Sequence, residues 1–559
     1  MSPSSPFEKM KNLFKAYQTH TANRFLSPVR RIERIAPPAD RRVVAFVFDN
    51  GPTAGATGSA AAGRTAAATA GAGTAAATTA ATSARGTTEA ILAALEAHGA
   101  RATFNIIGTT AENYPDTQGE PGTPLWNGVK FDHYPAFERD AEGGAVNQPD
   151  LVRRLVAGGH ELANHSYSHV PFGRPAESDL ASRVCLTNST RALDDLRLLH
   201  NFIRDNFSAS GAVDGANSTD DDGYEMRLAR PPRGIDRTLD GKDAYYIFAE
   251  MGYNYLAASF DGGGWWPSTG SHAGDVAAMA TPVEEALRAD EGALNGQIIH
   301  LNDGYDPSGK TPVVDALPLQ LEALRRAGYE IVTVSELLEI TPFADLAPDD
   351  EGQEAVRGLL AAGHVVAYKN NTFLPDRDLS LGELAAMMLP RQVWRESAET
   401  RTASAVAAAR ARATQRGGRG GLGPRGGAGG VPGAASGTVD GHLDDAWEAA
   451  TGRGGMFGLG GGFGGGAGAG GGAAGGRPGD MRLRDVRPSH PYYEAIQAVI
   501  TAGLRVPAGL YKPDMFASRQ YALEALAVVT GHEPPRLRDR HGISRREFAI
   551  QLWQAIGRK

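Results

Sequence analysis

Short apolar runs alternate with segments of helical periodicity in the first part of the chain. Residues 43–49 and 102–108 are apolar runs that end in polar or glycine residues, as buried parallel strands do. Between them, residues 88–98 repeat apolar positions at helical spacing, and Gly99 follows as a helix-ending residue. A strand, a helix and a strand in this order predict a βαβ unit.

The same alternation continues to residue 340. We expect helices over 150–157, 182–206, 282–289 and 314–327, and strands over 160–164, 254–260, 297–302 and 329–334. Repeated alternation predicts an α/β fold with a parallel sheet, either open or barrel-like. In both forms the active site lies at the carboxyl ends of the strands.

Beyond residue 340 the pattern changes to pairs of helices. In the first pair, within 343–389, Ser380 and Glu383 form a capping box for the second helix. A second copy begins at residue 483. A third, truncated copy begins at residue 543 and has a capping box at 544–547. The C-terminal part is therefore predicted to be a small all-α region built from repeats.

Glycine marks the boundaries between these segments. The chain has 71 glycines in 559 residues, and their concentration in tracts predicts low-complexity inserts between folded parts. The resulting division is a polar N-terminal arm at 1–40, an α/β domain at 41–340 with a low-complexity insertion at 54–86, a first helical pair at 341–394, a Gly/Ala-rich disordered linker at 395–480, and the second and third helical copies at 481–559.

Charge and composition exclude several classes of protein. A net charge of −8 and a pI of about 6.0 do not fit a general nucleic-acid binder, and we interpret the basic stretch 416–425 as a solvated linker. Cys185 is the only cysteine, so no disulfide and no cysteine metal cluster is expected. No run of 18 apolar residues predicts a membrane span, and the N-terminus lacks the apolar stretch of a signal peptide.

Polar residues follow four of the predicted strands: Asp49 with Asn50, His165 with His169, Asp261, and Asn302 with Asp303. If the backbone between His165 and His169 is helical, both imidazoles can reach one metal ion. Asp49 or Asn50 would then supply an oxygen ligand, and an open position would hold water.

An arginine-proline turn lies between these strand ends. Arg230 and the two prolines after it form a rigid turn, because proline fixes φ. Arg233 is the next residue that has a backbone N–H. We therefore expect this N–H to donate to a developing oxyanion.

Five segments in order resemble the motifs of polysaccharide deacetylases, also called the NodB-homology domain or carbohydrate esterase family four. They are FDNGPT (48–53), ATFNIIG (102–108), GHELANHSYSH (159–169), RPPRG (230–234) and QIIHLNDG (297–304). The resemblance implies a distorted (β/α) barrel and a divalent metal, commonly zinc. It also implies hydrolysis of acetyl groups on polymers such as peptidoglycan, chitin or xylan.

The resemblance also implies roles for single residues. Asp49 would be the catalytic base, and Arg230 would pair with it. The metal ligands would be His165, His169 and Asn50. The Arg233 backbone N–H would line the oxyanion hole, Trp265 would form a wall of the substrate groove, and Asp261 would orient the acid histidine.

Three positions depart from the family's pattern. Asn50 replaces the metal-binding aspartate and brings no charge, so we expect weaker metal binding. Asn302 stands where the acid histidine is expected, and we expect its amide to contact the oxyanion or the substrate. Period two places His300 on the same face of the strand. His300 is therefore either the acid or a buried, hydrogen-bonded histidine. Gly264 replaces one of the two carboxylates expected around Asp261.

The C-terminal helical copies resemble S-layer-homology (SLH) repeats. That resemblance implies binding of secondary cell-wall polysaccharide through Arg519, Arg545 and Glu547, and a location at the bacterial cell surface. The sequence thus predicts a metal-dependent polysaccharide deacetylase that is anchored to the cell wall. The alternative is a catalytically weakened or inactive, glycan-binding surface protein with a deacetylase-like groove.

Overall fold

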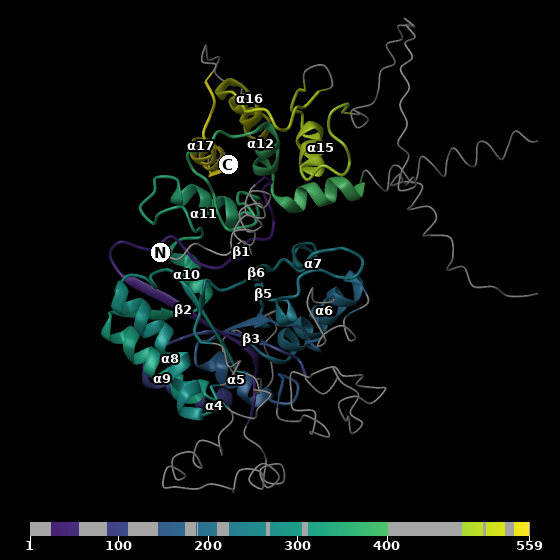
Figure 1. Cartoon of the computed structure of the whole chain (residues 1–559). Helices are drawn as coiled ribbons and strands as arrows, with labels where there is room; N and C mark the ends of the chain where they lie inside the picture. The colour runs from purple at the N-terminus through teal and green to yellow at the C-terminus, as the bar shows by residue number, and fades with distance from the viewer. Residues whose placement is uncertain are drawn as a thin grey trace, which may run out of the picture. The chain divides into compact units, whose positions relative to one another are not determined.

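The structure, a computed structural model, describes most of the predicted folded segments (Figure 1). The described residues are 24–54, 87–109, 143–173, 186, 188–208, 223–263, 269–303, 311–400, 483–506, 510–531 and 541–557. The chain divides into two units, Met1–Arg395 with Leu483–Lys559, and Glu396–Arg482. Every element named below belongs to the first unit.

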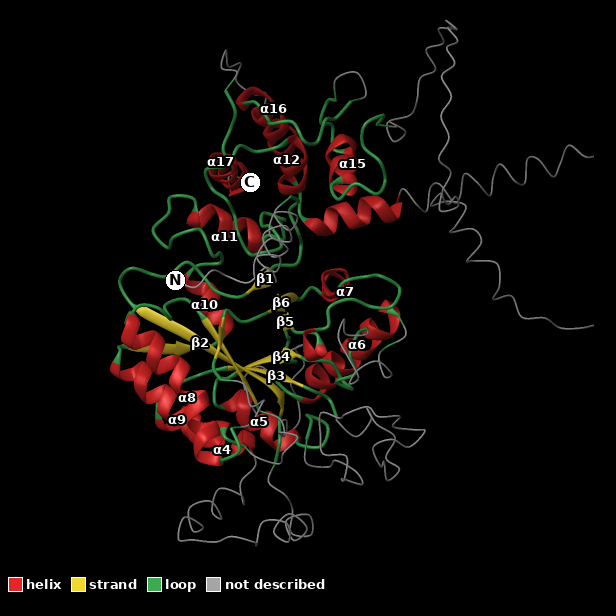
Figure 2. Cartoon of the chain, viewed as in Figure 1, coloured by secondary structure: helices red, strands yellow, loops and turns green. Residues whose placement is uncertain are grey.

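Nine parallel strands form one sheet in the described part of the chain (Figure 2). They are β1 Arg31–Ile32, β2 Arg42–Gly51, β3 Thr103–Ile106, β4 Glu161–Asn164, β5 Leu228–Ala229, β6 Asn254–Leu256, β7 Phe260–Asp261, β8 Ile298–Asn302 and β9 Tyr329–Val332. The order is β1-β6-β5-β4-β3-β2-β8-β7, and β9 also pairs with β2. Because β1 and β7 end this path without pairing to each other among the described strands, the sheet is an open half-barrel. The predicted α/β class is confirmed.

Helices alternate with the strands along this part of the chain (Figure 2). They are α4 Thr87–Ala97, α5 Pro149–Ala157, α6 Ser189–Asn206, α7 Ala244–Met251, α8 His272–Ala289, α9 Val313–Arg326 and α10 Val334–Ile340. Helix α9 packs against both α4 and α8. No helix in the described segments is long and apolar enough to cross a membrane.

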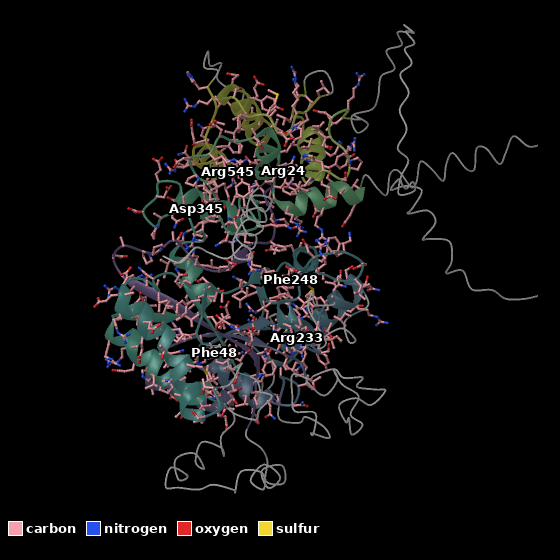
Figure 3. The ribbon with its side chains drawn as sticks, viewed as in Figure 1. Arg24, Phe48, Arg233, Phe248, Asp345 and Arg545 are labelled. Atoms are coloured by element: carbon pink, nitrogen blue, oxygen red, sulfur yellow. The ribbon has the colours of Figure 1, made fainter. Side chains whose placement is uncertain are left out.

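Strand β2 separates two cores because successive side chains of a strand point to opposite faces. Phe46 and Phe48 belong to the large core shared with the helices, and Phe48 is labelled in Figure 3. Ala45 and Val47 belong to a smaller core on the other face, which also receives side chains of α10. Because side chains alternate along the strand, Asp49 lies on the same face as Ala45 and Val47, at the carboxyl end of the strand.

Several boundaries differ from those predicted. The expected strand at 254–260 is two short strands, β6 and β7, and the helix expected to begin at residue 182 begins at Ser189. Asn188 caps that helix, since its side chain accepts a hydrogen bond from the Arg191 N–H. Strands β1 and β5 and helices α7 and α10 were not predicted; β1 lies within the expected polar arm.

The C-terminal helices have a core of their own. They are α11 Gln353–Ala361, α12 Leu381–Met388, α15 Tyr493–Thr501, α16 Arg519–Thr530 and α17 Arg545–Gly557. Both bonds of the predicted capping box at Ser380 and Glu383 are present. At α17 the Ser544 hydroxyl accepts from the Glu547 N–H, while the Glu547 carboxylate pairs with Arg519.

Two of the helical copies share the same turn. The Asp345 carboxylate accepts hydrogen bonds from the N–H groups of Phe373 and Leu374, both at 2.8 Å. Asp485 accepts in the same way from the N–H groups of 511–512, at 3.0 and 2.6 Å. The second N–H donor of each pair has a positive φ, 53° in the first copy and 55° in the second. The two copies are therefore structurally equivalent at this turn.

Backbone hydrogen bonds join the segments that precede α12, α16 and α17. The Leu379 N–H donates to the Ile543 carbonyl at 2.9 Å, and the Ala517 N–H donates to the Leu379 carbonyl at 2.7 Å. The Arg519 N–H donates to the His541 carbonyl at 3.1 Å. Each of the three segments thus contacts the other two, so the helical copies pack together and do not form separate units.

The N-terminal segment 24–36 contacts both the sheet and the helical copies. Leu26 lies in the helical core, and its N–H donates to the Tyr492 hydroxyl at 2.7 Å. Strand β1 pairs with β6, and the Arg31 N–H donates to the Lys369 carbonyl at 2.7 Å. This part of the expected polar arm is an ordered strap, which corrects the prediction for residues 24–40.

Candidate active site

The candidate site is built from the carboxyl ends of neighbouring strands. Asp49 and Asn302 are register partners on β2 and β8, and Asn105 on β3 is the partner of Asp49 on the other side. His165 directly follows β4, and Arg230 directly follows β5. Since parallel strands end at one edge of the sheet, these side chains meet there as predicted.

Asp49 is the most densely contacted carboxylate of the site. Its Oδ2 lies 2.8 Å from Arg230 Nε and 3.0 Å from His300 Nε2, while its Oδ1 accepts from Asn105 Nδ2 at 2.7 Å. The residue is only 5% exposed. Burial alone would raise the pKa of Asp49, but Arg230 and the imidazoles of His300 and His165 hold that pKa well below its ordinary value. Asp49 is therefore an ionised carboxylate at neutral pH.

His165 and His169 come together through a turn and not through a helix. Ser166 and His169 both have a positive φ, of 75° and 56°, so the helical backbone considered for this segment is wrong. The turn is held by the His169 N–H, which donates to Ser166 Oγ at 2.9 Å. The two imidazole centroids are 4.8 Å apart. The turn thus achieves the pairing that the spacing suggested.

Both imidazoles are neutral. Burial lowers the pKa of His165 to about 3 and that of His169 to about 4. His165 Nδ1 lies 2.9 Å from the Arg230 carbonyl, which can only accept, so Nδ1 carries the proton. The lone pair of His165 is then on Nε2, 4.0 Å from Asp49 Oδ2.

These donors fit a divalent metal. Neutral imidazole is a common ligand of zinc, and the carbonyl bonded to His165 Nδ1 is the usual partner of a ligating histidine. Asn50 Oδ1 is buried and has no hydrogen-bond partner, as expected of an oxygen that awaits a cation. Among the described residues no group of three His, Cys, Asp or Glu side chains could hold a metal. The third ligand would therefore be the amide of Asn50.

His300 and Asn302 both face the site, but they have different partners. His300 is half-buried and contacts the base, Asp49. Asn302 Oδ1 accepts from Asn50 Nδ2 at 3.2 Å. His300 is therefore not a histidine bonded away from the site, and it can exchange a proton with Asp49.

Asp261, Arg233 and Trp265 are the remaining predicted site residues. The Asp261 carboxylate is exposed and accepts from the Gly263 N–H at 3.2 Å, so it does not orient His300, contrary to the prediction. Asp261 is the register partner of His300 on the neighbouring strand, but its carboxylate bonds the backbone of its own loop. Arg233 lies in a short 3-10 turn, Pro232–Gly234, with a φ of 58° (Figure 3). Trp265, residues 55–86 and residues 401–480 lie outside the described residues.

Sequence reasoning missed Asn105 and the support around Asp303. Asn105 is a fully buried polar residue in an apolar strand, and that contrast was the available signal. Asp303 is buried, its N–H donates to the Asp49 carbonyl at 2.7 Å, and burial raises its pKa well above the ordinary value. The Thr88 hydroxyl donates to the Asp303 carboxyl, and a Cβ on Gly51 would lie 2.0 Å from Asp303 Oδ2. Glycine is required at that position.

The predicted polysaccharide-binding residues of the helical copies are not equivalent. Arg545 is fully buried: it donates to the carbonyl of Phe373 at 2.6 Å and lies 3.7 Å from Glu383 (Figure 3). It cannot reach a glycan, which corrects the prediction for this residue. Arg519 and Glu547 form a two-pronged, partly exposed ion pair at 2.9 and 2.8 Å.

Comparison with known proteins identifies the α/β part. Residues 36–196 match the family model of polysaccharide deacetylases. This segment is part of a polysaccharide deacetylase domain. A chitooligosaccharide deacetylase of Bradyrhizobium sp. is 27% identical over 201 residues, 34% of this chain and 73% of that protein. A peptidoglycan-N-acetylglucosamine deacetylase of Bacillus cereus is 26% identical over 192 residues, 34% of this chain and 68% of that protein.

The deacetylase domain is thereby placed among hydrolases of carbon–nitrogen bonds other than peptide bonds. A solved chitin deacetylase from the fungal pathogen Colletotrichum lindemuthianum is 18% identical and covers 56% of this chain and 92% of its own, with a TM-score of 0.33. A TM-score of that size adds no support. The family match ends at residue 196, so the SLH resemblance of the C-terminal helices stays a prediction.

Proposed function

We propose that the deacetylase domain is a metal-dependent N-deacetylase of an acetylated cell-wall polymer. The two sequence relatives suggest the substrate classes, a chitin-like oligosaccharide or peptidoglycan. The observation that carries the proposal is the environment of Asp49. Its ionised carboxylate is fixed by Arg230, Asn105 and His300, and it lies 4.0 Å from the free nitrogen of His165.

Each side chain then has a task in amide hydrolysis. Asp49 accepts a proton from the water that adds to the acetyl carbonyl carbon, and Arg230 favours the ionised form of this base. The Arg233 backbone N–H donates to the developing oxyanion. As the carbon–nitrogen bond breaks, His300 donates a proton to the departing amine, so that acetate and a free amine result. A divalent metal, which we expect to be zinc, would supply Lewis acidity to the carbonyl.

We also propose that the helical copies anchor the enzyme to secondary cell-wall polysaccharide at the bacterial surface. Support comes from the equivalent turns at Asp345 and Asp485 and from the closure of the three segments on one another. Since Arg545 is buried, the partly exposed pair of Arg519 and Glu547 is the remaining candidate contact.

The second candidate function is glycan binding without hydrolysis. Two positions favour it: Asn302 stands where the resemblance places the acid, and Asn50 offers the metal no charge. The contact of His300 with Asp49 favours the enzyme instead, because it supplies the missing proton donor at 3.0 Å.

Acetate release by the purified full chain distinguishes the two. Chitooligosaccharide and peptidoglycan are each incubated with protein that is zinc-loaded, chelated, or chelated and reloaded. Release that is lost on chelation and restored by zinc is the expected result. Release only from an Asn50→Asp variant would indicate a decayed site. Glycan binding without release in either form would favour the second candidate.

A further inference from the structure

The two asparagines that depart from the family's pattern contact each other. Asn50 follows the base at the end of β2, with a φ of 78°. Asn302 ends β8 and is the register partner of Asp49. The Asn50 Nδ2 group donates to Asn302 Oδ1 at 3.2 Å.

This hydrogen bond fixes the orientation of the Asn50 amide, because it holds the Nδ2 group against Asn302. A carboxylate presents an oxygen whichever way it turns, but an amide has one oxygen and one NH2 group. If the amide flips, it presents the NH2 group, which has no lone pair for a metal. An acceptor beside Asn50 must therefore hold Nδ2 in place for Oδ1 to serve as a ligand.

The state of Asn50 Oδ1 fits this requirement. The oxygen is buried without a hydrogen-bond partner, which is unfavourable for a polar atom. His165 keeps its own lone pair on the nitrogen that faces Asp49, the neighbour of Asn50. A cation between these groups would satisfy the oxygen.

We propose that Asn302 is a positioning residue that orients Asn50 Oδ1 as a neutral metal ligand, so that the two substitutions work as a pair. The inference rests on the metal-dependent function proposed above. It gives Asn302 a task different from that of an acid or an oxyanion donor, and it assigns the proton donor's role to His300 alone. Asn302 acts through Asn50 and touches neither metal nor substrate.

Zinc affinity of the full chain, measured by competition with a chromophoric chelator, tests the proposal without reference to activity. Asn302→Leu keeps the size of the side chain and removes the acceptor. We expect it to weaken zinc binding about tenfold or more, as loss of a ligand's supporting partner does. In an Asn50→Asp background the same change is expected to cost about twofold or less, because a carboxylate needs no orientation.

Two further variants complete the design. Asn302→Asp keeps an acceptor oxygen and is expected to bind zinc at least as tightly as the wild type. Asn302→Ala repeats the deletion with a smaller side chain, and both positions are only half-buried, so folding is expected to persist. Equal losses from Asn302→Leu in the two backgrounds would overturn the pairing while leaving the metal site intact. No zinc binding by either the wild type or Asn50→Asp would overturn the proposed function as well.

Discussion

At the scale of single residues, the site depends on one buried carboxylate whose charge is offset from several sides. Asp49 loses hydration by burial, and the Arg230 guanidinium is the largest of the contacts that compensate for this loss. Asn105 adds a neutral donor to the other oxygen. The base is therefore both ionised and fixed in direction before substrate binds, which is what general-base catalysis requires.

Replacing Asn105 should slow catalysis without removing any group that reacts. Asn105→Leu leaves Asp49 Oδ1 buried without its donor, and we expect kcat to fall about tenfold or more. The change in KM should be smaller, because Asn105 contacts the base and not the substrate. Steady-state acetate release measures both constants.

Thr103→Val is the matched control for this prediction. Thr103 lies two residues earlier on β3, and its hydroxyl bonds Glu161 and not the base. The kcat of the Thr103→Val variant is expected to stay near that of the wild type. A Thr103→Val loss as large as that of Asn105→Leu would show that general strain in β3 is responsible.

Motif order located most of this site in advance, but not its contacts. The sequence placed Asp49, His165, His169 and Arg230 at strand ends, because the carboxyl ends of parallel strands share one edge. The direction of His300 depended on the register of β8 against β2, which no local pattern determines.

At the scale of elements, the helical copies are held together by charged pairs of different burial. Arg545 and Glu383 are both at most 1% exposed, and the arginine also stacks over Tyr368 at 4.8 Å. Arg519 and Glu547, from the neighbouring copies, are partly exposed. In both pairs the arginine and the glutamate occupy the same positions relative to the starts of their helices. The helical copies therefore use the same Arg–Glu contact twice, once buried and once partly exposed.

Removal of the buried arginine should destabilise the helical region far more than removal of the exposed one. Arg545→Met breaks a fully buried pair and leaves Glu383 with the partly exposed Arg377, 3.9 Å away, and we expect a cost of about 3–5 kcal/mol. Arg519→Met breaks a pair near the surface, for which the cost is about 1 kcal/mol or less.

Urea unfolding followed by the circular dichroism of the full chain measures the difference. The Arg545→Met midpoint is expected well below that of Arg519→Met. Equal midpoints would contradict the assignment of Arg545 as a structural residue and would leave it open to glycan.

At the scale of the whole molecule, the N-terminal strap connects two cores that sequence analysis treated as separate domains. Its large buried apolar residues are Leu26, Val29, Ile32 and Ile35. They recur at every third position, which is the period of neither a β-strand nor an α-helix, and so the pattern predicted no element. Arg30 within the strap donates to the Pro342 carbonyl at 2.7 Å and to Asn371 Oδ1 at 3.1 Å.

A charge introduced into the strap should therefore destabilise the C-terminal helical region, although the two are far apart in sequence. Leu26→Asp places a carboxylate in the helical core, and we expect the melting temperature of that region to fall by several degrees or more. Hydrogen exchange of the peptide containing Ala367, which bonds the strap, should accelerate. Leu198→Asp is the control, because Leu198 is 56% exposed. Unchanged exchange in Leu26→Asp would contradict a contribution of the strap to the stability of the helical region.

The central claim is that this site hydrolyses acetylated glycan although two of its positions are asparagine. Acetate release from chitooligosaccharide by the zinc-loaded full chain, compared with Asp49→Asn, tests it most directly. We predict measurable release that falls about 10²–10⁴-fold in Asp49→Asn, since the base is lost. Equal release from both proteins, or none from the wild type on either chitooligosaccharide or peptidoglycan, would contradict it.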